Sequence, residues 1–211
     1  KNTEYVHNCK IIYSHSFDYD TYLRELEVKK KNSDDYIVFV DNGACEHPDY
    51  NLLEQTPTDK AETYYPKINK FFQRVEKIYN KKIIICSHPR IRNIEKISNL
   101  FGNREIVIDK TSEYIRNSSL VLIHDSTAIS FAVLWNKPLI FVSSNEMKSN
   151  RYFVISHILR SLNIKDYNID KSNKNFNFEY QSYKALDMYL FYKDNYIKHP
   201  KSNSKFSFEI L

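Results

Sequence analysis

His88 is the first candidate for chemistry, because it directly follows the short apolar run Lys82–Cys86 and is itself followed by Pro89. Proline suits the first turn of a helix, where its missing N–H costs nothing, so we expect a helix to begin here with His88 at its N-terminus. An imidazole beside the free N–H groups of a helix start can hold a phosphate. The structural alternative is that Ser87 caps this helix and His88 is a surface residue.

A second polar cluster, His124-Asp125-Ser126-Thr127, follows the apolar run Leu120–Ile123 and precedes another predicted helix. Asp, Ser and Thr all favour the N-cap position, but three of them after a histidine exceed what capping requires. The hydroxyls of Ser126 and Thr127, with helix N–H groups, could cradle a phosphate without glycine; simple capping is the alternative. Two such helix starts in one parallel sheet can converge on a single anionic ligand.

Carboxylates form a third cluster at Asp41, Glu46 and Asp49, after the apolar run Tyr36–Val40. A carboxylate or histidine at this place could act as a general base that removes a proton from a hydroxyl. The spacing is not that of a calcium loop, and His47 with Asp49 would supply only two ligands, so we predict no metal site. The alternative is an Asx-type turn with solvated acids.

Short β-branched runs alternate with stretches of helical periodicity from residue 36 onward, and this order must position the three clusters. The expected strands are rich in Ile and Val, as strands buried on both faces should be: Tyr36–Val40, Lys82–Cys86, Glu105–Ile108, Leu120–Ile123 and Leu139–Val142. The expected helices between them are Tyr65–Tyr79, Ile91–Leu100, Ser112–Asn117 and Ala128–Asn136. The pattern predicts an α/β, Rossmann-like parallel sheet flanked by helices, with ligand sites at the carboxyl ends of its strands.

The segments outside this alternation suggest three parts: an N-terminal segment 1–35, a Rossmann-like domain 36–165, and a C-terminal helix with a polar tail, 166–211. Before the alternation, we expect a strand at Ile11–Tyr13 and a helix at Asp20–Lys30. After it, the pattern predicts a helix, a polar loop and a terminal helix, at Tyr152–Leu162, Asp166–Asn177 and Tyr180–Tyr196 respectively.

Composition excludes several classes of function. The chain has 211 residues, 42% of them hydrophobic, enough for a folded domain with a core. Only two glycines occur, which excludes the Gly-rich phosphate loops of dehydrogenases and P-loop enzymes. The formal net charge is +5, but the basic residues are interleaved with acidic ones and form no basic block. No nucleic-acid-binding motif is present, so nucleic acid is not an expected partner.

The cysteine count and the hydropathy bear on where the protein works. Three cysteines without a CxxC pair fit a reducing compartment better than a disulfide framework or a zinc ribbon. The cysteine usage thus points to the cytoplasm, and no run of about 18 apolar residues is present, so we expect no membrane-spanning helix. Lysine and aromatic residues near the C-terminus suggest peripheral contact with the inner face of a membrane.

Three short motifs, VFVDNG, ICSHPR and LIHDSTAISFAVLWNKPLIFV, together resemble those of bacterial CMP-sialic acid-type glycosyltransferases of the GT-B fold. The last motif also resembles the donor-binding half of teichoic-acid glycerophosphotransferases and capsule glycosyltransferases. The resemblance covers residues 36–146, and the order of the motifs at strand ends supports it more than any single one. It implies one half of a GT-B architecture, with an N-terminal acceptor domain missing, which agrees with the absence of an initiator Met.

The resemblance also implies roles for individual residues. His88 with Pro89, His124, Ser126 and Thr127 would bind the donor, and Glu146 would be a candidate for contacting the ribose. The loop 109–113 would meet the base and ribose.

For the general base, the resemblance points to Asp41. Asn42 replaces the second acid of the family's acid-acid-Gly pattern, and Glu46 or Asp49 are the alternatives.

The implied activity is the transfer of an acidic, sialic acid-like sugar from a CMP-activated donor to a surface glycan, without metal or other cofactor. The alternatives are a CDP-alcohol or UDP-sugar transferase of cell-surface polymer synthesis, and a non-catalytic α/β binding module.

Overall fold

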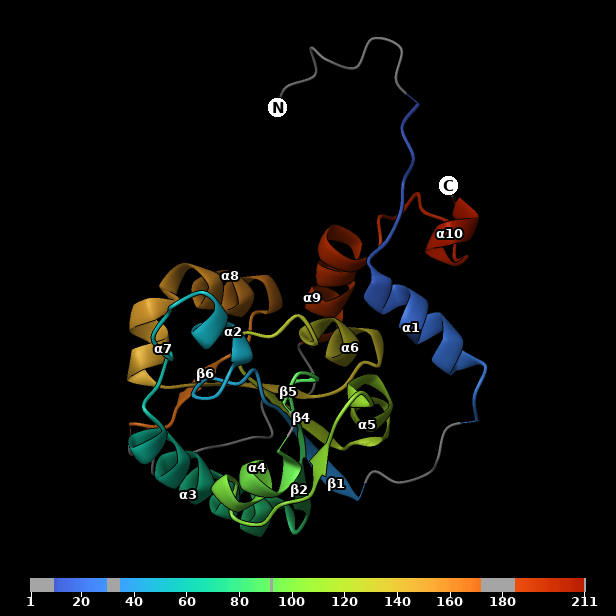
Figure 1. Cartoon of the computed structure of the whole chain (residues 1–211). Helices are drawn as coiled ribbons and strands as arrows, with labels where there is room; N and C mark the ends of the chain where they lie inside the picture. The colour runs from blue at the N-terminus through green and yellow to red at the C-terminus, as the bar shows by residue number, and fades with distance from the viewer. Residues whose placement is uncertain (1–9, 30–34, 92, 172–184, 211) are drawn as a thin grey trace.

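Six parallel strands form the central sheet in the order β3-β2-β1-β4-β5-β6 (Figure 1). The computed structural model describes residues 10–29, 35–91, 93–171 and 185–210. The strands are β1 Tyr36–Val40, β2 Lys82–Cys86, β3 Ile106–Val107, β4 Leu120–Ile123, β5 Leu139–Ser143 and β6 Asp166–Asn168. The predicted Rossmann-like parallel sheet is therefore confirmed. Its strand order reverses direction between β1 and β4, where a doubly wound sheet opens a crevice for ligands.

The register of the sheet places the ends of three strands level with one another. Val40, the last residue of β1, pairs with Cys86 of β2 on one side and Ile123 of β4 on the other. The three predicted clusters follow these paired residues directly. They therefore leave the sheet side by side at its carboxyl edge.

Burial explains why these segments form strands. The apolar residues of β1, β2 and β4 are almost fully buried, as β-branched residues in a sheet covered on both faces should be. Phe39 of β1 packs edge-on against Phe72 and Phe101, at ring-centroid distances of 4.9 and 5.9 Å. This aromatic cluster anchors the sheet to the helices that follow β1 and β2.

The helices cover both faces of the sheet. They are α1 Phe17–Leu26, α2 Pro48–Leu52, α3 Ala61–Tyr79, α4 Ile94–Leu100, α5 Thr111–Asn117, α6 Ile129–Leu134, α7 Asn145–Asn150, α8 Tyr152–Leu162, α9 Ala185–Tyr192 and α10 Ser207–Ile210, with a π-helical turn at Lys193–Ile197. Figure 1 shows α3 and α4 on one side of the sheet and α6, α8 and α9 on the other. Helix α3 buries a stripe that includes Ile68, Phe72 and Val75, and its C-cap residue, Asn80, has a left-handed φ of 50°.

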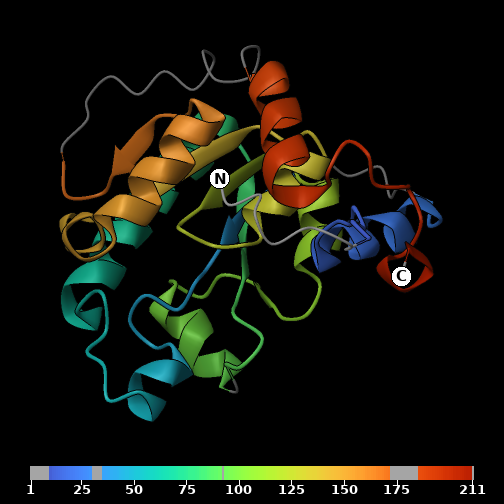
Figure 2. The same cartoon turned by 90° about the horizontal axis from the view of Figure 1, so that it is seen from above.

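The N-terminal helix packs on the sheet domain. The rings of Tyr22 in α1 and Trp135 after α6 lie 4.5 Å apart, and Ser112 in α5 donates to Glu25 at 2.9 Å. The C-terminal segment joins the same layer, because the backbone N–H of Ser207 donates to Asp20 at 2.8 Å. Figure 2 shows α1 and α10 lying side by side.

Several sequence predictions need correction. Within residues 10–29, Ile11–Tyr13 forms no strand, and the helix expected at Asp20–Lys30 is α1, which begins earlier and ends at Leu26. The loop expected at Asp166–Asn177 begins with strand β6, which pairs with β5 although its sequence is polar. The buried ring of Tyr167 stacks on that of Phe71 at a centroid distance of 4.4 Å. This packing stabilises the strand although its sequence lacks an apolar pattern.

Helices α2, α7 and α10 were not expected, β3 is shorter than predicted, and other differences lie at helix ends. The helix expected directly after His88 begins only at Ile94, because Asn93 accepts the backbone N–H of Lys96 and caps the helix there. The terminal helix is observed at Ala185–Tyr192, and residues 172–184 lie outside the described part of the chain. Within the parts of the chain that the structure describes, no helix has both the length and the apolar character to span a bilayer.

Candidate functional site

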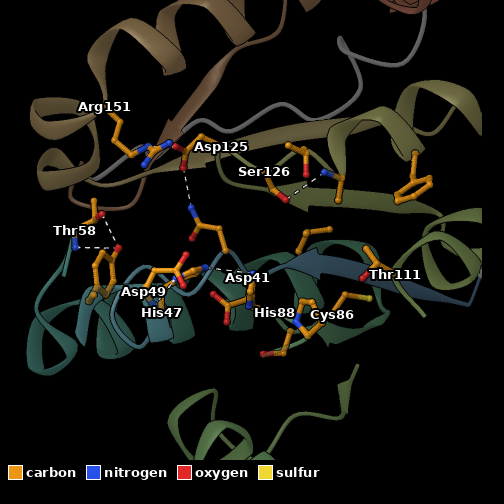
Figure 3. Close-up of a pocket in the computed structure, with 18 of the residues that line it drawn as sticks. Asp41, His47, Asp49, Thr58, Cys86, His88, Thr111, Asp125, Ser126 and Arg151 are labelled. Carbon is orange, nitrogen blue, oxygen red and sulfur yellow. Dashed lines mark hydrogen bonds and ion pairs between the residues drawn. The ribbon is translucent and has the colours of Figure 1, made fainter. Parts of the chain in front are cut away.

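A pocket of about 570 Å³ lies at the carboxyl edge of the sheet, beside the reversal of strand order between β1 and β4. This volume is in the range of small-molecule sites, and its position is where ligands bind in doubly wound sheets. The side chains that line it come mainly from the loops after β1, β2 and β4 (Figure 3). They include Asp41, Asn42, His47, Asp49, Ser87, His88, Pro89, Thr111, Asp125, Ser126, Thr127 and Arg151.

The structure brings most of the predicted site residues together. Asp41 comes from the loop after β1, His88 and Pro89 from the loop after β2, and Ser126 and Thr127 from the loop after β4. All five line the same pocket, as parallel strands with level ends require. Their roles in binding or catalysis remain proposals.

Three of the predicted residues lie outside the pocket, Glu46, Glu146 and the core residue His124. Glu46 is not among its lining residues, and its carboxylate accepts a hydrogen bond from Lys96 at 2.6 Å. Glu146 lies exposed in the first turn of α7, beyond the end of β5. Because β5 lies one strand further from the reversal than β4, its end is displaced from the crevice.

His124 is part of the core. Its side chain is 0% exposed, and its Nδ1 and Nε2 atoms lie 2.7 Å from the carbonyl oxygen of Val142 and 2.6 Å from the hydroxyl of Tyr64. The carbonyl can only accept, so Nδ1 carries the proton and Nε2 accepts from the tyrosine. Burial lowers the pKa of His124 to about 4. With both nitrogens engaged, this ring supports β4 and β5 from within and is not positioned to contact a ligand.

Asp41 combines burial with access to the pocket. Its side chain is only 5% exposed, and one carboxylate oxygen accepts the backbone N–H of Gly43 at 2.9 Å. Burial is the main cause that raises the pKa of Asp41 to about 6, against the lowering effect of the Gly43 backbone N–H and of the nearby Ser87 side chain. Asp41 can therefore exchange a proton close to neutral pH.

Gly43 makes the turn that holds Asp41. Its φ of 72° lies in the left-handed region, which side chains other than glycine rarely adopt, and a Cβ there would approach the backbone of His47 to 3.2 Å. The tight turn folds the loop back, so that Asp41 and His47 both reach the pocket.

His88 is held by a turn and not by a helix N-terminus. The backbone N–H of Ile91 donates to the carbonyl of His88 at 3.0 Å, and that of Arg90 donates to the ring Nδ1 at 3.3 Å. The expected contribution of a helix dipole at His88 is therefore absent, because α4 begins at Ile94. Burial, and then the neighbouring His47 and Arg90, lower the pKa of His88, which favours the neutral ring.

Ser126 has a structural role as well as a place in the pocket. Its hydroxyl accepts the backbone N–H of Ala128 at 3.3 Å, and its carbonyl accepts that of Ile129 at 3.2 Å, at the start of α6. These bonds close a short turn before α6, whose N-cap is Ala128 and has no side-chain hydrogen bond, so Ser126 does not cap the helix itself. The same hydroxyl still has a proton to donate into the pocket.

Sequence patterns missed the contacts among several lining residues, and missed Arg151 altogether. Asn42 donates to Asp125 at 2.7 Å, and Asp125 also forms an ion pair with Arg151. The Nε2 atoms of His47 and His88 approach to 3.2 Å. The His-Pro dipeptide at position 47 repeats the one at 88 and could have been noticed, whereas Arg151 follows β5 and no local pattern relates it to Asp125. Among the described residues, no group of three or more His, Cys, Asp or Glu side chains is arranged to hold a metal ion.

Comparison with family models and with curated proteins finds no match. Among solved structures, the chain is similar to the crystal structure of Methanocaldococcus jannaschii UDP-GlcNAc 2-epimerase in complex with UDP-GlcNAc and UDP. The identity is 18% over 90% of this chain and 46% of that chain, with a TM-score of 0.40. The chain thus spans about half the length of that enzyme, and at this level of similarity the pocket itself must indicate the function.

Proposed function

We propose that this chain is the donor-binding half of a glycosyltransferase, which transfers an acidic, sialic acid-like sugar from a CMP-activated donor to a hydroxyl of a surface glycan. The observation that supports it best is the meeting of Asp41, His88, Ser126 and Thr127 around one pocket at the reversal of the sheet. A buried carboxylate and several neutral hydrogen-bond donors in one pocket match a reaction that needs a base and an anion site.

In the proposed reaction, the bond between the anomeric carbon of the sugar and the phosphate oxygen of CMP breaks, and its electron pair stays on the phosphate. The acceptor hydroxyl forms the new bond to the anomeric carbon and loses its proton. Donors aimed at the departing phosphate stabilise the charge that develops there, which is commonly the largest contribution to such catalysis. His88, Ser126 and Thr127 are the donors that we assign to this task.

Asp41 is the proposed general base. A base works best when its pKa lies near the working pH, and burial has brought the pKa of Asp41 to about 6. The two alternatives are both engaged: Glu46 with Lys96, and Asp49 in an ion pair with Arg90. Asp41 alone of the three is a buried carboxylate that lines the pocket.

The nucleoside would occupy the part of the pocket near Thr111, the first residue of α5; of the segment 109–113 expected as a loop, residues 111–113 form the first turn of this helix. Ser112 beside Thr111 is turned away and bonds to Glu25 and to the indole N–H of Trp135. A second α/β half would bind the acceptor. This fits the proposed cleft, because the sheet of this chain forms only one of its walls. We place the reaction in the cytoplasm, where CMP-activated sugars would be available.

Calorimetry with CMP, CDP and UDP tests the proposal. We expect CMP to bind with the highest affinity, and a CMP-activated acidic sugar to release CMP when the complete two-half enzyme is given an acceptor glycan. A clear preference for CDP or UDP would instead favour a CDP-alcohol or UDP-sugar transferase. If no nucleotide raises the melting temperature even at high concentration, the chain is a non-catalytic binding module, because a ligand specific for the folded state must stabilise it.

A further inference from the structure

His47 and His88 begin two copies of the same three-residue pattern, His-Pro-x, at 47–49 and 88–90. In each copy the backbone N–H of the third residue donates to Nδ1 of the histidine: Asp49 to His47 at 3.1 Å, and Arg90 to His88 at 3.3 Å. Proline has no N–H, so the third residue supplies the first backbone donor within reach of the ring. The two turns face each other, and their third residues, Asp49 and Arg90, form an ion pair.

This local geometry decides which nitrogen carries the proton. A backbone N–H can only donate, so the Nδ1 atom that it contacts must accept and cannot be protonated. A neutral imidazole carries one proton, which is then on Nε2. Both His47 and His88 are therefore set to present an Nε2–H group.

The two Nε2 atoms lie only 3.2 Å apart, and the ring centroids 4.3 Å apart. Two N–H donors at that distance cannot bond to each other. One ring could move its proton to Nδ1, but it would then lose its backbone hydrogen bond. The alternative is a third group that accepts from both Nε2–H groups at once.

We propose that His47 is a second phosphate-binding residue, and that one phosphate oxygen of the nucleotide accepts hydrogen bonds from Nε2 of both His47 and His88. A phosphate oxygen suits this position, since it has several lone pairs, no proton to donate and a negative charge that strengthens both bonds. Asp49 forms the ion pair with Arg90 through Oδ1, which offsets its repulsion of the anion, while its Oδ2 lies 3.7 Å from Nδ1 of His47, beyond hydrogen-bond distance. Asp41 lines the same pocket, and one of its carboxylate oxygens is engaged by the backbone N–H of Gly43.

The inference rests on the proposed function for the identity of the phosphate, but its test does not depend on sugar transfer. A third copy of the pattern, His199-Pro200-Lys201, provides a matched control. Lys201 donates to Nδ1 of His199 at 3.1 Å, so the local geometry is the same. His199 stacks on Tyr13 and is not among the residues that line the pocket.

Binding of CMP, cytidine and inorganic phosphate to the 211-residue chain is the first measurement. His47→Ala should weaken CMP about 10- to 100-fold, the usual effect of losing one hydrogen bond to a charged group. It should weaken inorganic phosphate in parallel and leave cytidine unchanged, because cytidine has no phosphate. His199→Ala should change none of the three affinities. His47→Gln, which restores an N–H donor, should recover part of the CMP affinity and guards against a folding effect.

Nitrogen NMR of the histidine rings is the second measurement, and it reports the tautomers directly. With CMP or phosphate bound, both His47 and His88 should show protonated Nε2 and unprotonated Nδ1, and both Nε2 signals should shift on titration. A shift at His88 with none at His47, or equal loss of CMP and cytidine affinity in His47→Ala, would overturn the inference while leaving the transferase proposal intact. If His47→Ala weakens phosphate binding but the complete enzyme turns over no CMP-sugar, the inference about His47 stands and the transferase proposal is overturned.

Discussion

The side-chain amide of Asn42 donates to Asp125 at 2.7 Å, between the loops that follow the neighbouring strands β1 and β4, where the strand order reverses. Asp125, only 1% exposed at its side chain, is also paired with Arg151 from the junction of α7 and α8. These contacts join the loop that holds Asp41 to the loop that holds Ser126. Two walls of the pocket are thus fixed relative to each other by one buried carboxylate.

Asn42→Asp tests this relationship. The change restores the acid-acid-Gly pattern but places a second carboxylate against Asp125 in a buried site, where two like charges cannot both ionise freely. We expect the free energy of unfolding at pH 7.5 to fall by about 2–3 kcal/mol, the scale of a buried charged group that loses its partner. The loss should shrink at pH 5, where the pair can share a proton. Urea unfolding at both pH values measures it.

Asn42→Ala is the control for the charge. It removes the hydrogen bond without adding a carboxylate, so its smaller loss of stability should vary little between the two pH values. Equal stability of wild type and Asn42→Asp at pH 7.5 would show that Asn42 does not join the loops.

Asp41→Asn should stabilise the folded state and, by removing the proposed general base, abolish sugar transfer. Burial raises the folded pKa of Asp41 to about 6, above its ordinary value of 3.8, so the folded state holds the proton more tightly than the unfolded state. Stability is then greatest below about pH 4 and falls as the pH rises from 4 to 6. Replacing the acid removes that fall. We expect a gain of about 2 kcal/mol at pH 7.5 and none at pH 4, measured by denaturant unfolding.

Asp59→Asn is the matched control for catalysis. Asp59 is also buried, at 4% exposed, and burial raises its pKa to about 6, but it bonds to Ser144 and is not among the lining residues of the pocket. Its replacement should give a pH-dependent change of the same sign without loss of transfer activity. If Asp41→Asn retains full turnover, Asp41 is not the base.

His88→Ala should lower the turnover of a CMP-sugar donor by about two orders of magnitude, roughly the effect of removing one donor to a developing oxyanion. The measurement is steady-state release of CMP by the complete enzyme. Glu146→Gln provides the comparison, because Glu146 lies exposed on α7 and not in the pocket. Unchanged CMP affinity and turnover in His88→Ala would remove His88 from the mechanism.

Tyr64→Phe should cost stability without affecting the ligand. The change removes the hydroxyl that donates to Nε2 of His124 at 2.6 Å and leaves a fully buried acceptor without its donor. We expect the free energy of unfolding to fall by about 1–3 kcal/mol. CMP affinity, measured by calorimetry, should stay within twofold of wild type. A large loss of CMP affinity with an unchanged free energy of unfolding would indicate that His124 takes part in ligand binding.

The Ile- and Val-rich runs were sufficient to predict five strands and the parallel sheet, because a strand buried on both faces must be apolar along its whole length. β6 escaped notice because an edge strand needs only one well-packed residue, Tyr167, and can otherwise be polar. The helix expected at His88 was wrong because Pro89 fits the first turn of a helix but equally fits the turn that is observed.

The sequence by itself determined the order of the elements, the type of sheet and the edge at which Asp41, His88 and Ser126 emerge, since local periodicity and strand ends depend on near neighbours in the chain. Only the tertiary structure decided which side chains face one another. The side chain of His124 is buried in the core, whereas Ser126, two residues later, lines the pocket. His47 contacts His88, which is 41 positions away in the sequence. Such choices depend on packing and hydrogen bonds between distant segments, which no local pattern records.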